Sequence, residues 1–318
     1  MILVTGANGF VGSALTARFA RGKTGVRAAM RRPAAARQPG IEQVVAPSLS
    51  AGADWRPALE GVSAVVHAAA RVHVMRDEAA DPLAEFRSAN VEGTLALARQ
   101  AAAAGIARFV FLSSIKVNGD STPPDRPFSA ADAPQPLDPY GVSKLEAERA
   151  LAALARETGL EVVIVRPPLV YGPGVKANFF ALLKWLHRGV PLPFGAIRNR
   201  RSLVALENLV DLVAICVEHP AARGQTLLVS DGEDLSTTEL LRRLAAALGK
   251  RARLVPVPER ALVVAARALG LGSLAQRLCG SLCVDSAPTR QLLGWAPPLS
   301  VDEGLRAAAE AYLREARG

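Results

Sequence analysis

The chain has 318 residues, half of them hydrophobic, which is enough for a substantial core in one large or two modest domains. No uninterrupted apolar run reaches the roughly 18 residues that a membrane-spanning helix needs, and the three cysteines, Cys216, Cys279 and Cys283, are too few and too poorly spaced for a disulfide framework or a zinc site. The net charge of +9 could indicate a nucleic-acid-binding protein, but the arginines are scattered and are not interleaved with aromatic residues.

The first element is a strand at residues 2–5 that enters a glycine-rich turn, followed by an amphipathic helix that includes residues 14–19. Gly6, Gly9 and Gly12 permit a tight turn, a close approach of the backbone to a pyrophosphate and close helix–strand packing. The start of the helix supplies N–H donors and a favourable dipole. The spacing is G-x-x-G-x-x-G instead of the more usual G-x-G-x-x-G, but its position between strand and helix predicts dinucleotide binding.

The second strand, at residues 26–30, bears on the choice of dinucleotide because it ends in Arg31 and Arg32. Sites selective for NAD carry an Asp or Glu at this point to accept from the ribose 2′-hydroxyl, whereas an arginine accommodates a 2′-phosphate. No acid is present here. We therefore favour NADP(H) and keep NAD(H) as an alternative, in which the two arginines are solvated loop charges.

The next strands, near 42–46, 62–67 and 108–113, place small and hydroxyl residues at their carboxyl ends. Ligands of open parallel sheets bind at these ends. We expect Ala69, Ser113 and Ser114 to gather beside the glycine turn. His67 ends a buried strand and is expected to be a hydrogen-bonded core histidine and not a catalytic base.

A polar, proline-rich stretch at 118–139 is predicted to be a long loop, with the length of a functional lid. Tyr140 and Lys144 follow it, and four residues is about one helical turn, so the two side chains should share a helix face. A lysine ammonium a few ångströms away would lower the pKa of the tyrosine toward a useful acid–base range. Without its context, this pair would be an ordinary solvated helix face.

The fold class predicted from this alternation is α/β, a doubly wound Rossmann sheet of about seven parallel strands with a smaller, mainly helical C-terminal substrate-binding domain. The last two strands are expected near 161–165 and 225–229. We assign residues 1–172, with about 204–230, to the dinucleotide-binding domain. Residues 173–203 and 231–318 are assigned to the cap, and the substrate is expected between the two.

The stretch 259–282 is apolar, with arginines spaced along it. It has two interpretations: an amphipathic segment on a membrane surface, or a packed helix pair in the cap. We favour the helix pair.

With these motifs in order, the chain resembles the extended short-chain dehydrogenases/reductases, in the nucleotide-sugar epimerase/dehydratase family. The residues that carry the resemblance lie at 5–12, 67–70, 90–94, 113–114, 140–144, 166–173, 201–204 and 293–295, and they span essentially the whole chain. Residues 67–74 and 112–119 are similar to those of bacterial UDP-sugar 4-ketoreductases of the N-acetylquinovosamine dehydrogenase type.

The resemblance implies roles for individual residues. Ser114, Tyr140 and Lys144 would be catalytic: Tyr140 as the acid–base, Ser114 as a hydrogen-bond donor to the substrate oxygen, and Lys144 as a partner of the nicotinamide ribose. Lys116, Asn178 and Arg201 would bind substrate. The expected cofactor contacts are Gly6, Asn8, Gly9, Phe10, Val11, Gly12, Arg31, Arg32, Ala68, Ala69, Ala70, Asn90, Ser113, Tyr140, Lys144 and Pro167.

Three departures from the family pattern affect these expectations. The missing acid beside Arg31 is unlike the 4-epimerases of the family, which keep NAD tightly bound, and favours a reductase that exchanges NADPH. Residues 46–48 replace the Gly-Asp often found near the adenine. Ser202 and Ala205 stand where the family's Arg-Asp-x-x-His stretch has Asp and His, so the local hydrogen bonding there is open.

The preferred function is NAD(P)H-dependent reduction of a UDP-linked 4-keto-6-deoxyhexose at C4, for surface polysaccharide biosynthesis. A UDP-sugar 4-epimerase would use the same residues, and a non-catalytic dinucleotide sensor would not need the triad. Reduction of a non-sugar ketone is a weaker alternative.

We expect a cytoplasmic protein, because the first strand begins at residue 2 and leaves no room for a secretion signal. Nucleic-acid binding and membrane insertion are not expected. The family commonly forms homodimers through a four-helix bundle, here near residues 84–104 and 141–157.

Overall fold

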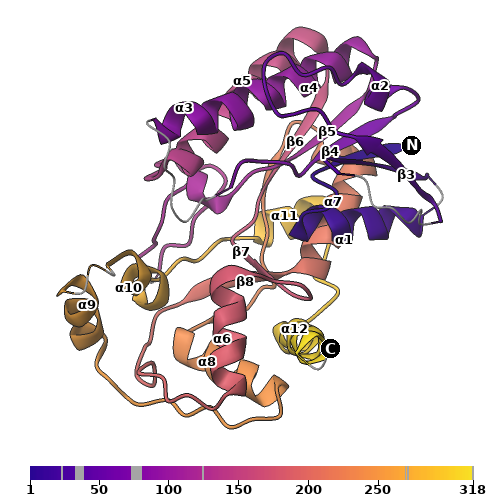
Figure 1. The fold of residues 1–318 in the computed structure, drawn as a ribbon. Helices are drawn as coiled ribbons and strands as arrows, with labels where there is room; N and C mark the ends of the chain where they lie inside the picture. The colour runs from indigo at the N-terminus through magenta and orange to yellow at the C-terminus, as the bar shows by residue number, and fades with distance from the viewer. Residues whose placement is uncertain are drawn as a thin grey trace.

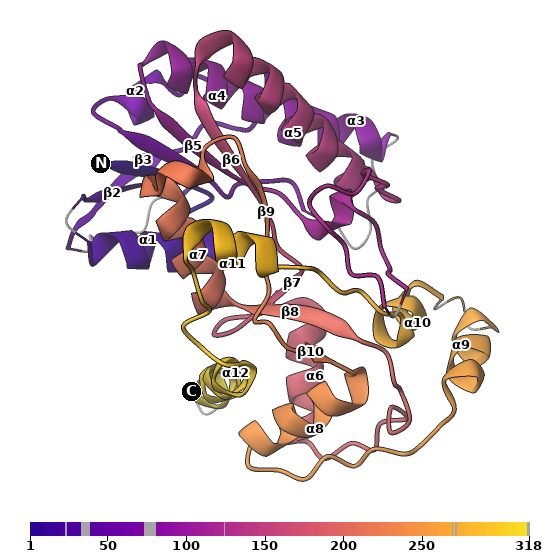
Figure 2. The same ribbon diagram turned by 180° about the vertical axis from the view of Figure 1, so that it is seen from behind.

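The computed structural model describes residues 1–22, 24–32, 39–72, 81–123, 125–268, 270 and 272–316. Figure 1 shows two lobes, a large one containing the N-terminus and a smaller one built from the later part of the chain, and Figure 2 shows them from behind. Pro33 and His73 lie outside the described residues. No described helix is long and apolar enough to cross a membrane.

The large lobe is built on a seven-stranded sheet with the strand order β3-β2-β1-β4-β5-β6-β9, in which every neighbouring pair is parallel. The strand order reverses between β1 and β4, the switch point where open α/β sheets bind ligands. The prediction of a doubly wound parallel sheet is confirmed. The strands are β1 (Ile2–Thr5), β2 (Val26–Met30), β3 (Ile41–Val45), β4 (Ala64–His67), β5 (Arg108–Leu112), β6 (Glu161–Arg166) and β9 (Thr226–Leu228).

Helices cover both faces of this sheet, since both faces are apolar. One face packs against α1 (Phe10–Ala20) and α7 (Leu206–Glu218). The other packs against a layer that includes Trp55, Leu97 and Leu151. This second layer consists of α2 (Arg56–Leu59), α3 (Pro82–Arg87), the π-helical turn η1 (Ser88–Glu92), α4 (Gly93–Ala103) and α5 (Pro139–Thr158). Two short 3₁₀ turns, η2 (Ile115–Val117) and η3 (Pro220–Ala222), follow strand β5 and helix α7.

The small lobe has its own three-stranded sheet and its own apolar core. The sheet has the order β10-β8-β7, with β7 parallel and β10 antiparallel to β8. Its elements are β7 (Leu169–Tyr171), β8 (Arg201–Ala205), β10 (Asp234–Leu235), α6 (Ala177–His187), α8 (Thr237–Ala247), α9 (Glu259–Ala268), α10 (Gly272–Cys279) and α12 (Val301–Glu315).

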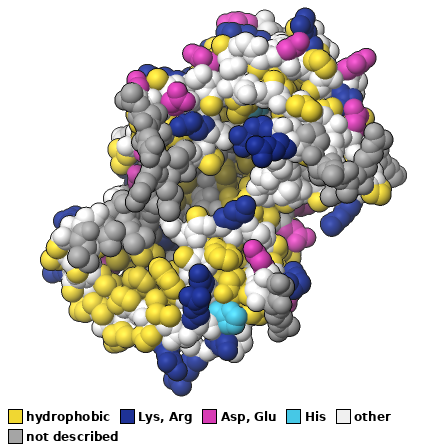
Figure 3. All heavy atoms as spheres, in the orientation of Figure 1, with side chains coloured by type: hydrophobic (Ala, Val, Ile, Leu, Met, Phe, Trp, Pro, Cys, Tyr) yellow, Lys and Arg dark blue, Asp and Glu magenta, His cyan; other side chains and the backbone are white. Residues whose placement is uncertain are grey.

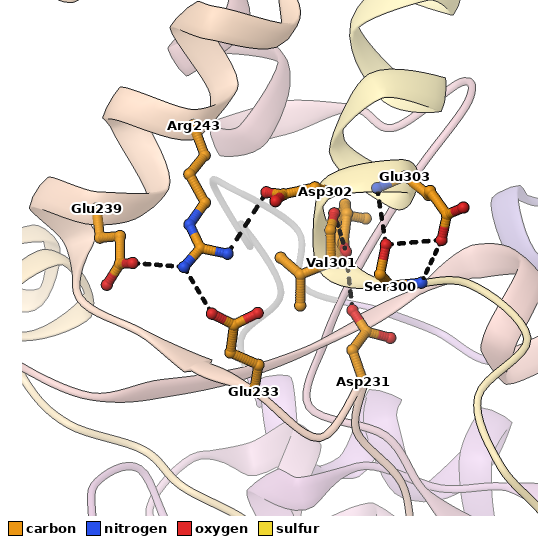
Figure 4. A network of polar contacts seen from close by, with 9 residues as sticks. Asp231, Glu233, Glu239, Arg243, Ser300, Val301, Asp302 and Glu303 are labelled. Carbon is orange, nitrogen blue, oxygen red and sulfur yellow. Dashed lines mark hydrogen bonds and ion pairs between the residues drawn. The ribbon is translucent and has the colours of Figure 1, made fainter.

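Charged contacts join α8 to α12 in this lobe (Figure 4). The Arg243 guanidinium of α8 lies 2.6 Å from the Glu233 carboxylate, 2.5 Å from Glu239 and 3.4 Å from Asp302 at the start of α12. Ser300 and Glu303 form a capping box at the N-terminus of α12. The capping box makes α12 begin at a defined residue, which fixes where this helix lies against the small sheet.

The division of the chain into two domains remains a prediction, and one late segment contacts the large lobe. Helix α11 (Ala287–Leu293) is followed by Trp295, and both Leu293 and Trp295 belong to the apolar core of the seven-stranded sheet. The Trp295 indole donates to Asp211 of α7 at 3.0 Å. The chain therefore returns to the large lobe before it forms α12.

The predicted loop at 118–139 is held by main-chain hydrogen bonds to the segment that follows α10. The Thr122 and Phe128 amides donate to the carbonyls of Ser281 and Cys283 at 2.9 and 2.8 Å. Asp285 donates back to the Phe128 carbonyl at 2.9 Å. The loop thus links the two lobes beside Tyr140.

Candidate active site

A groove of about 1210 Å³ runs along the carboxyl ends of the parallel strands, and Figure 3 shows a hollow between the two lobes. It collects the turn after β1, the ends of β2 to β6 and the start of α5. Most of the predicted cofactor residues line it: Gly6, Asn8, Gly9, Phe10, Val11, Gly12, Arg31, Ala68, Ala69, Ala70, Ser113, Tyr140, Lys144 and Pro167. Of the predicted catalytic residues, Ser114 lines it as well.

The backbone around the glycine turn is packed so closely that side chains at Gly6 and Gly12 would clash with it. A Cβ on Gly12 would lie 2.0 Å from the Gly6 carbonyl oxygen, and a Cβ on Gly6 would lie 2.9 Å from the Ala69 backbone. Gly6 also has φ +66°, which favours glycine. Gly9 is the N-cap of α1, and no side chain caps the helix. The open N–H groups at the start of α1 fit a pyrophosphate of a dinucleotide.

The end of β2 places one of the two predicted arginines at the groove. Both arginines are exposed, but only Arg31 lines the groove. Ala46, Pro47 and Ser48 after β3 line the same end. No acid lies at the end of β2, so this part of the groove carries positive charge where an NAD-selective site carries a carboxylate.

Trp55 also borders this end of the groove and was not predicted from the sequence. Its side chain is buried, and its indole N–H has no hydrogen-bond partner in the part of the chain that the structure describes. Buried donors in folded proteins are usually paired. The unpaired donor is consistent with a polar group of a bound ligand at this wall.

Tyr140 and Lys144 lie in the first turns of α5, and both face the groove. Asp138 caps the helix by accepting from the Gly141 amide at 2.7 Å, which fixes where α5 begins. The Lys144 Nζ atom lies 5.9 Å from the centre of the Tyr140 ring. The helical spacing therefore places the Tyr140 phenol and the Lys144 ammonium on one face of α5, as expected.

The predicted effect of Lys144 on the ionisation of Tyr140 is wrong. Burial and, to a smaller extent, the nearby Asp138 carboxylate raise the pKa of the Tyr140 phenol to about 12, and the hydrogen bond with Ser114 only partly opposes this. Burial also lowers the pKa of the Lys144 ammonium to about 7, with Glu148 opposing the change. Desolvation is the largest effect on both groups, so Tyr140 is protonated at neutral pH.

Lys144 is held by the strand beneath it. Its Nζ atom donates to the Leu112 carbonyl at 2.8 Å and lies 4.4 Å from the centre of the Phe111 ring. These contacts anchor the ammonium at the end of β5. One carbonyl leaves two of its three N–H groups for other partners within the groove.

The two serines after β5 have different surroundings. Ser113 donates a very short hydrogen bond to the buried Glu148 carboxylate, which also forms an ion pair with Arg166. Ser114 is the N-cap of η2 and accepts from the Lys116 amide at 3.2 Å. Ser114 therefore caps η2, a structural role that a serine can have without taking part in catalysis. Its hydroxyl oxygen is the acceptor in this contact, so the hydroxyl proton is still available as a donor.

Three predicted substrate residues do not line the groove. The Lys116 ammonium forms ion pairs with Asp120 at 2.8 Å and Asp138 at 2.7 Å. Asn178 is exposed near the start of α6. Arg201 donates to the Gly280 carbonyl at 2.9 Å, and this contact connects β8 to the end of α10.

Asn90 also lies outside the groove lining, although the resemblance implied a cofactor contact. Its side chain is buried in η1, accepts from the Arg71 amide at 2.8 Å and donates to the Ser143 hydroxyl at 3.0 Å. These bonds hold the segment after β4 against α5. Asn90 therefore supports the wall of the groove and does not face it.

His67 has the structural role that was predicted for it. His67 is fully buried between the hydroxyls of Thr5 and Thr94, at 2.7 and 3.0 Å, and burial lowers its pKa to about 3, with the Lys144 charge acting in the same direction. It is neutral at physiological pH. All three cysteines are free and buried, and no cluster of metal-ligating side chains is found among the described residues.

Ser202 and Ala205 show how the altered Arg-Asp-x-x-His stretch is hydrogen-bonded. The Ser202 hydroxyl donates to Asp234 at 2.5 Å and accepts from the Val284 amide at 2.9 Å. The Ala205 amide donates to Asp231 at 2.8 Å. These bonds join β8 to its neighbours and satisfy the polar groups locally.

Several groove residues were missed from the sequence because no motif marks them. They lie at or after the ends of strands, in β7, or on α3 and η1, and only the folded chain brings them to the groove. They are Met30, Leu49, Arg71, Val72, Glu85, Ser88, Ala89, Pro168 and Val170.

Comparison with known proteins gives a consistent result. Residues 2–229 match the model of the NAD dependent epimerase/dehydratase family. The chain is 45% identical to the UDP-glucose 4-epimerase of Vibrio cholerae over 98% of its length and 95% of that protein. It is 30% identical to the 2-alkyl-3-oxoalkanoate reductase of Stenotrophomonas maltophilia over 96% of its length and 97% of that protein. Its fold is similar to that of MoeE5 in complex with UDP-glucose and NAD, with a TM-score of 0.78, 26% identity and coverage of 100% and 99% of the two chains.

Proposed function

Because the chain belongs to the NAD dependent epimerase/dehydratase family, we propose that it is an NAD(P)-dependent oxidoreductase acting at C4 of a UDP-linked hexose. We further propose that its net reaction is the reduction of a 4-keto-6-deoxyhexose, as in the quinovosamine type that it resembles. The observation that carries this proposal is the gathering of Ser114, Tyr140 and Lys144 at one part of a groove whose other part is the glycine turn.

Tyr140 supplies the proton in this reaction. Its raised pKa means that the phenol carries its proton at neutral pH, which is the form needed to protonate a ketone oxygen. Ser114 donates a hydrogen bond to the same oxygen and stabilises the charge that develops there. When bound, the nicotinamide supplies the hydride for reduction, or accepts one in the reverse direction.

Lys144 binds the coenzyme in the proposal. With one N–H group held by the Leu112 carbonyl, its remaining N–H groups donate to the ribose next to the nicotinamide. The residues that would hold the rest of the dinucleotide are those of the glycine turn, where the close backbone packing at Gly6 and Gly12 fixes the turn at the start of α1.

NADP(H) is the favoured cofactor because of Arg31. This arginine borders the groove at the end of β2, where it can pair with a 2′-phosphate, and the position has no acid to accept from a 2′-hydroxyl. A reductase must exchange its coenzyme at every turnover, and an epimerase need not. The cofactor preference and the net reaction are therefore linked.

The UDP part of the substrate is proposed from the names of the relatives, which include UDP-glucose as substrate or ligand. Arg201 and Asn178 remain predicted contacts for it. Neither lines the groove, so a contact with either requires the ligand to reach the small lobe.

A second candidate function is UDP-sugar 4-epimerisation, and the 45% identity to a UDP-glucose 4-epimerase favours it. The same three residues would act, with Tyr140 first as base and then as acid. A phenol with a raised pKa gives up its proton less readily, so the oxidative step would be the harder one at neutral pH.

The deciding experiment mixes purified protein with a UDP-4-keto-6-deoxy-N-acetylhexosamine and NADPH or NADH, and follows absorbance at 340 nm. We expect stoichiometric loss of absorbance, faster with NADPH. Conversion of UDP-glucose or UDP-N-acetylglucosamine to its 4-epimer, without loss of absorbance in the first assay, would replace the reductase by the epimerase.

The coenzyme assignment has a matched control in the neighbouring arginine. Arg31→Asp should lower kcat/KM for NADPH by about 10- to 100-fold relative to NADH, the range expected for a lost hydrogen bond to a charged group. Arg32→Asp makes the same charge change outside the groove lining and should change that ratio by less than about threefold. Equal effects of the two substitutions would contradict the role of Arg31.

A further inference from the structure

The small lobe exposes several large apolar side chains. Trp185 of α6 is 40% exposed, Val190 after it 39%, Val255 48% and Val264 of α9 67%. Exposed apolar residues that occur singly need no explanation, but a group of them in one lobe indicates an interaction surface.

Hydrogen bonds connect the segments that carry these side chains. The Val190 amide donates to the Trp185 carbonyl at 3.1 Å. Leu192 and Leu254 form a parallel bridge, and the Val255 amide donates to the Leu192 carbonyl at 2.8 Å. The chain then enters α9, so the apolar residues are held on one framework.

Helix α9 is amphipathic but buries none of its side chains. Seven of its ten residues are apolar, and it packs against α10 while its own apolar residues stay at least partly exposed. The predicted helix pair is therefore present, but it leaves the apolar residues of α9 unburied. Figure 3 shows hydrophobic side chains gathered on the lobe that contains α9 and α10, with Lys and Arg side chains beside them.

The excess positive charge of the protein lies in the same segments. Residues 176–200 and 249–268 contain ten of the 38 Lys and Arg but only one of the 29 Asp and Glu, so the rest of the chain has 28 of each. Within the described residues, most of these basic side chains are exposed and have no ion pair or hydrogen bond through their charged group. These are Lys176, Lys184, Arg188, Arg198, Lys250, Arg251, Arg253, Arg260 and Arg267.

Many basic side chains of the large lobe are paired with carboxylates instead. Arg27, Arg87 and Arg108 each form an ion pair with a described carboxylate, as do several other arginines of that lobe. Unpaired cations next to exposed apolar side chains form a surface that is complementary to an anionic, partly apolar partner.

We propose that this basic apolar face, made by residues 184–190, 250–255 and α9, binds the surface of a bilayer that contains anionic phospholipid. The apolar side chains would enter the headgroup region, and the cations would meet lipid phosphates. Trp185 is of the residue type enriched at membrane interfaces. The association is peripheral, because no described helix is able to span a membrane. This proposal stands independently of the reaction proposed above.

The test is co-sedimentation of the whole protein with sucrose-loaded vesicles of phosphatidylcholine, with or without a third of phosphatidylglycerol. We expect at least tenfold stronger partitioning onto the anionic vesicles, and loss of most of it at high salt because surface charges are screened. Equal partitioning onto both vesicles, or none, would overturn the proposal.

Two pairs of variants separate this face from general effects of charge and hydrophobicity. Val264→Glu should lower partitioning at least about tenfold, whereas Leu292→Glu, at a residue 41% exposed on α11, should leave it unchanged. Arg253→Glu should lower it at least about fivefold, and Arg21→Glu, an exposed arginine at the end of α1, should not.

Unfolding temperature and coenzyme affinity must match the parent protein in all four variants, which shows that each is folded. Equal losses in a variant and its control would contradict the proposal. The proposal would also be contradicted if Val264→Glu left vesicle binding unchanged and altered the oligomeric state in sedimentation velocity. The face would then contact a second copy of the chain.

Discussion

At the scale of single residues, the candidate site depends on two buried ionisable groups, Tyr140 and Lys144, whose pKa values are shifted apart. Burial keeps the Tyr140 phenol protonated and lowers the pKa of the Lys144 ammonium, which therefore loses its proton more easily. Both shifts favour the neutral forms, as desolvation requires. The site is therefore set to donate a proton from Tyr140 at neutral pH.

Tyr140→Phe removes only the phenol hydroxyl and should abolish turnover, because that hydroxyl is the proposed proton donor to the ketone oxygen. Coenzyme affinity should stay within a few-fold of the parent value, since the ring is kept. Steady-state assays and coenzyme titration measure the two effects.

The control is Tyr312→Phe, which removes a hydroxyl on α12 that interacts with His187 at 3.3 Å. It should leave turnover nearly unchanged. If Tyr140→Phe keeps more than about a tenth of the parent activity, Tyr140 is not the acid.

The lowered pKa of Lys144 predicts a pH-dependent coenzyme affinity. In the proposed complex the ammonium donates to the ribose, and it loses its charge as the pH rises through about 7. The dissociation constant for coenzyme should therefore rise by up to about tenfold per pH unit above neutrality and level off below pH 6. Fluorescence titration between pH 5.5 and 8.5 would measure this.

Lys144→Met should bind coenzyme weakly at every pH in this range and lose the dependence. Lys116→Met is the matched control, because Lys116 is paired with two carboxylates that raise its pKa, against the opposing effect of burial. It should keep the pH dependence. A flat affinity profile in the parent protein would refute the proposed role of Lys144.

At the scale of elements, helix α5 is fixed by two ion pairs of different kinds. Glu148 pairs with Arg166 of β6 with side chains only 5% and 6% exposed, whereas Glu146 pairs with Arg87 of α3 at the surface. Arg166 also donates to Asn118 at 2.9 Å. The buried pair thus connects α5, β6 and the start of the long loop behind the catalytic residues.

Arg166→Met should lower the free energy of unfolding by about 3–5 kcal/mol, because it leaves the Glu148 carboxylate buried without its partner. Arg87→Met makes the same change at the exposed pair and should cost no more than about 1 kcal/mol. Urea unfolding followed by circular dichroism measures both. Similar small losses in the two variants would show that the buried carboxylate is solvated or protonated.

At the scale of the whole molecule, the predicted homodimer remains open to test. Helices α4 and α5 lie side by side on the large lobe, away from the small one (Figure 1). Exposed small residues such as Ala103 of α4 would permit close packing against a second copy.

If the four-helix bundle forms, the parent protein should sediment as a dimer and Ala103→Arg as a monomer with an unchanged unfolding temperature. The larger charged side chain would have no space in a tightly packed helix interface. Ala316→Arg, at the exposed end of α12, should remain a dimer. A parent protein that sediments as a monomer at micromolar concentration would contradict the prediction.

Much of the large lobe could be predicted from the sequence because its signals are local. Short apolar runs predicted the seven strands, and glycines that no other residue could replace predicted the turn. Helical spacing predicted that Tyr140 and Lys144 share one face of a helix. Each of these depends on neighbours within a few residues in the chain.

Other features depended on residues far apart in the chain, which no local pattern contains. Only the tertiary structure showed that Asn90 holds the segment after β4, that Lys116 pairs with Asp138, and that Glu148 reaches Arg166. It also reversed the predicted direction of the Tyr140 shift, because the desolvation of a group depends on everything packed around it.

The sequence by itself therefore determined which hydrophobic segments become strands and in what order along the chain. It also determined the glycine turn and the types of catalytic side chain. The tertiary structure decided which of these side chains reach the groove, how strongly each is desolvated and where the unpaired positive charge is left exposed. The physical reason is that backbone conformation follows from local sterics and periodicity, whereas burial and charge pairing follow from contacts formed only when the chain is folded.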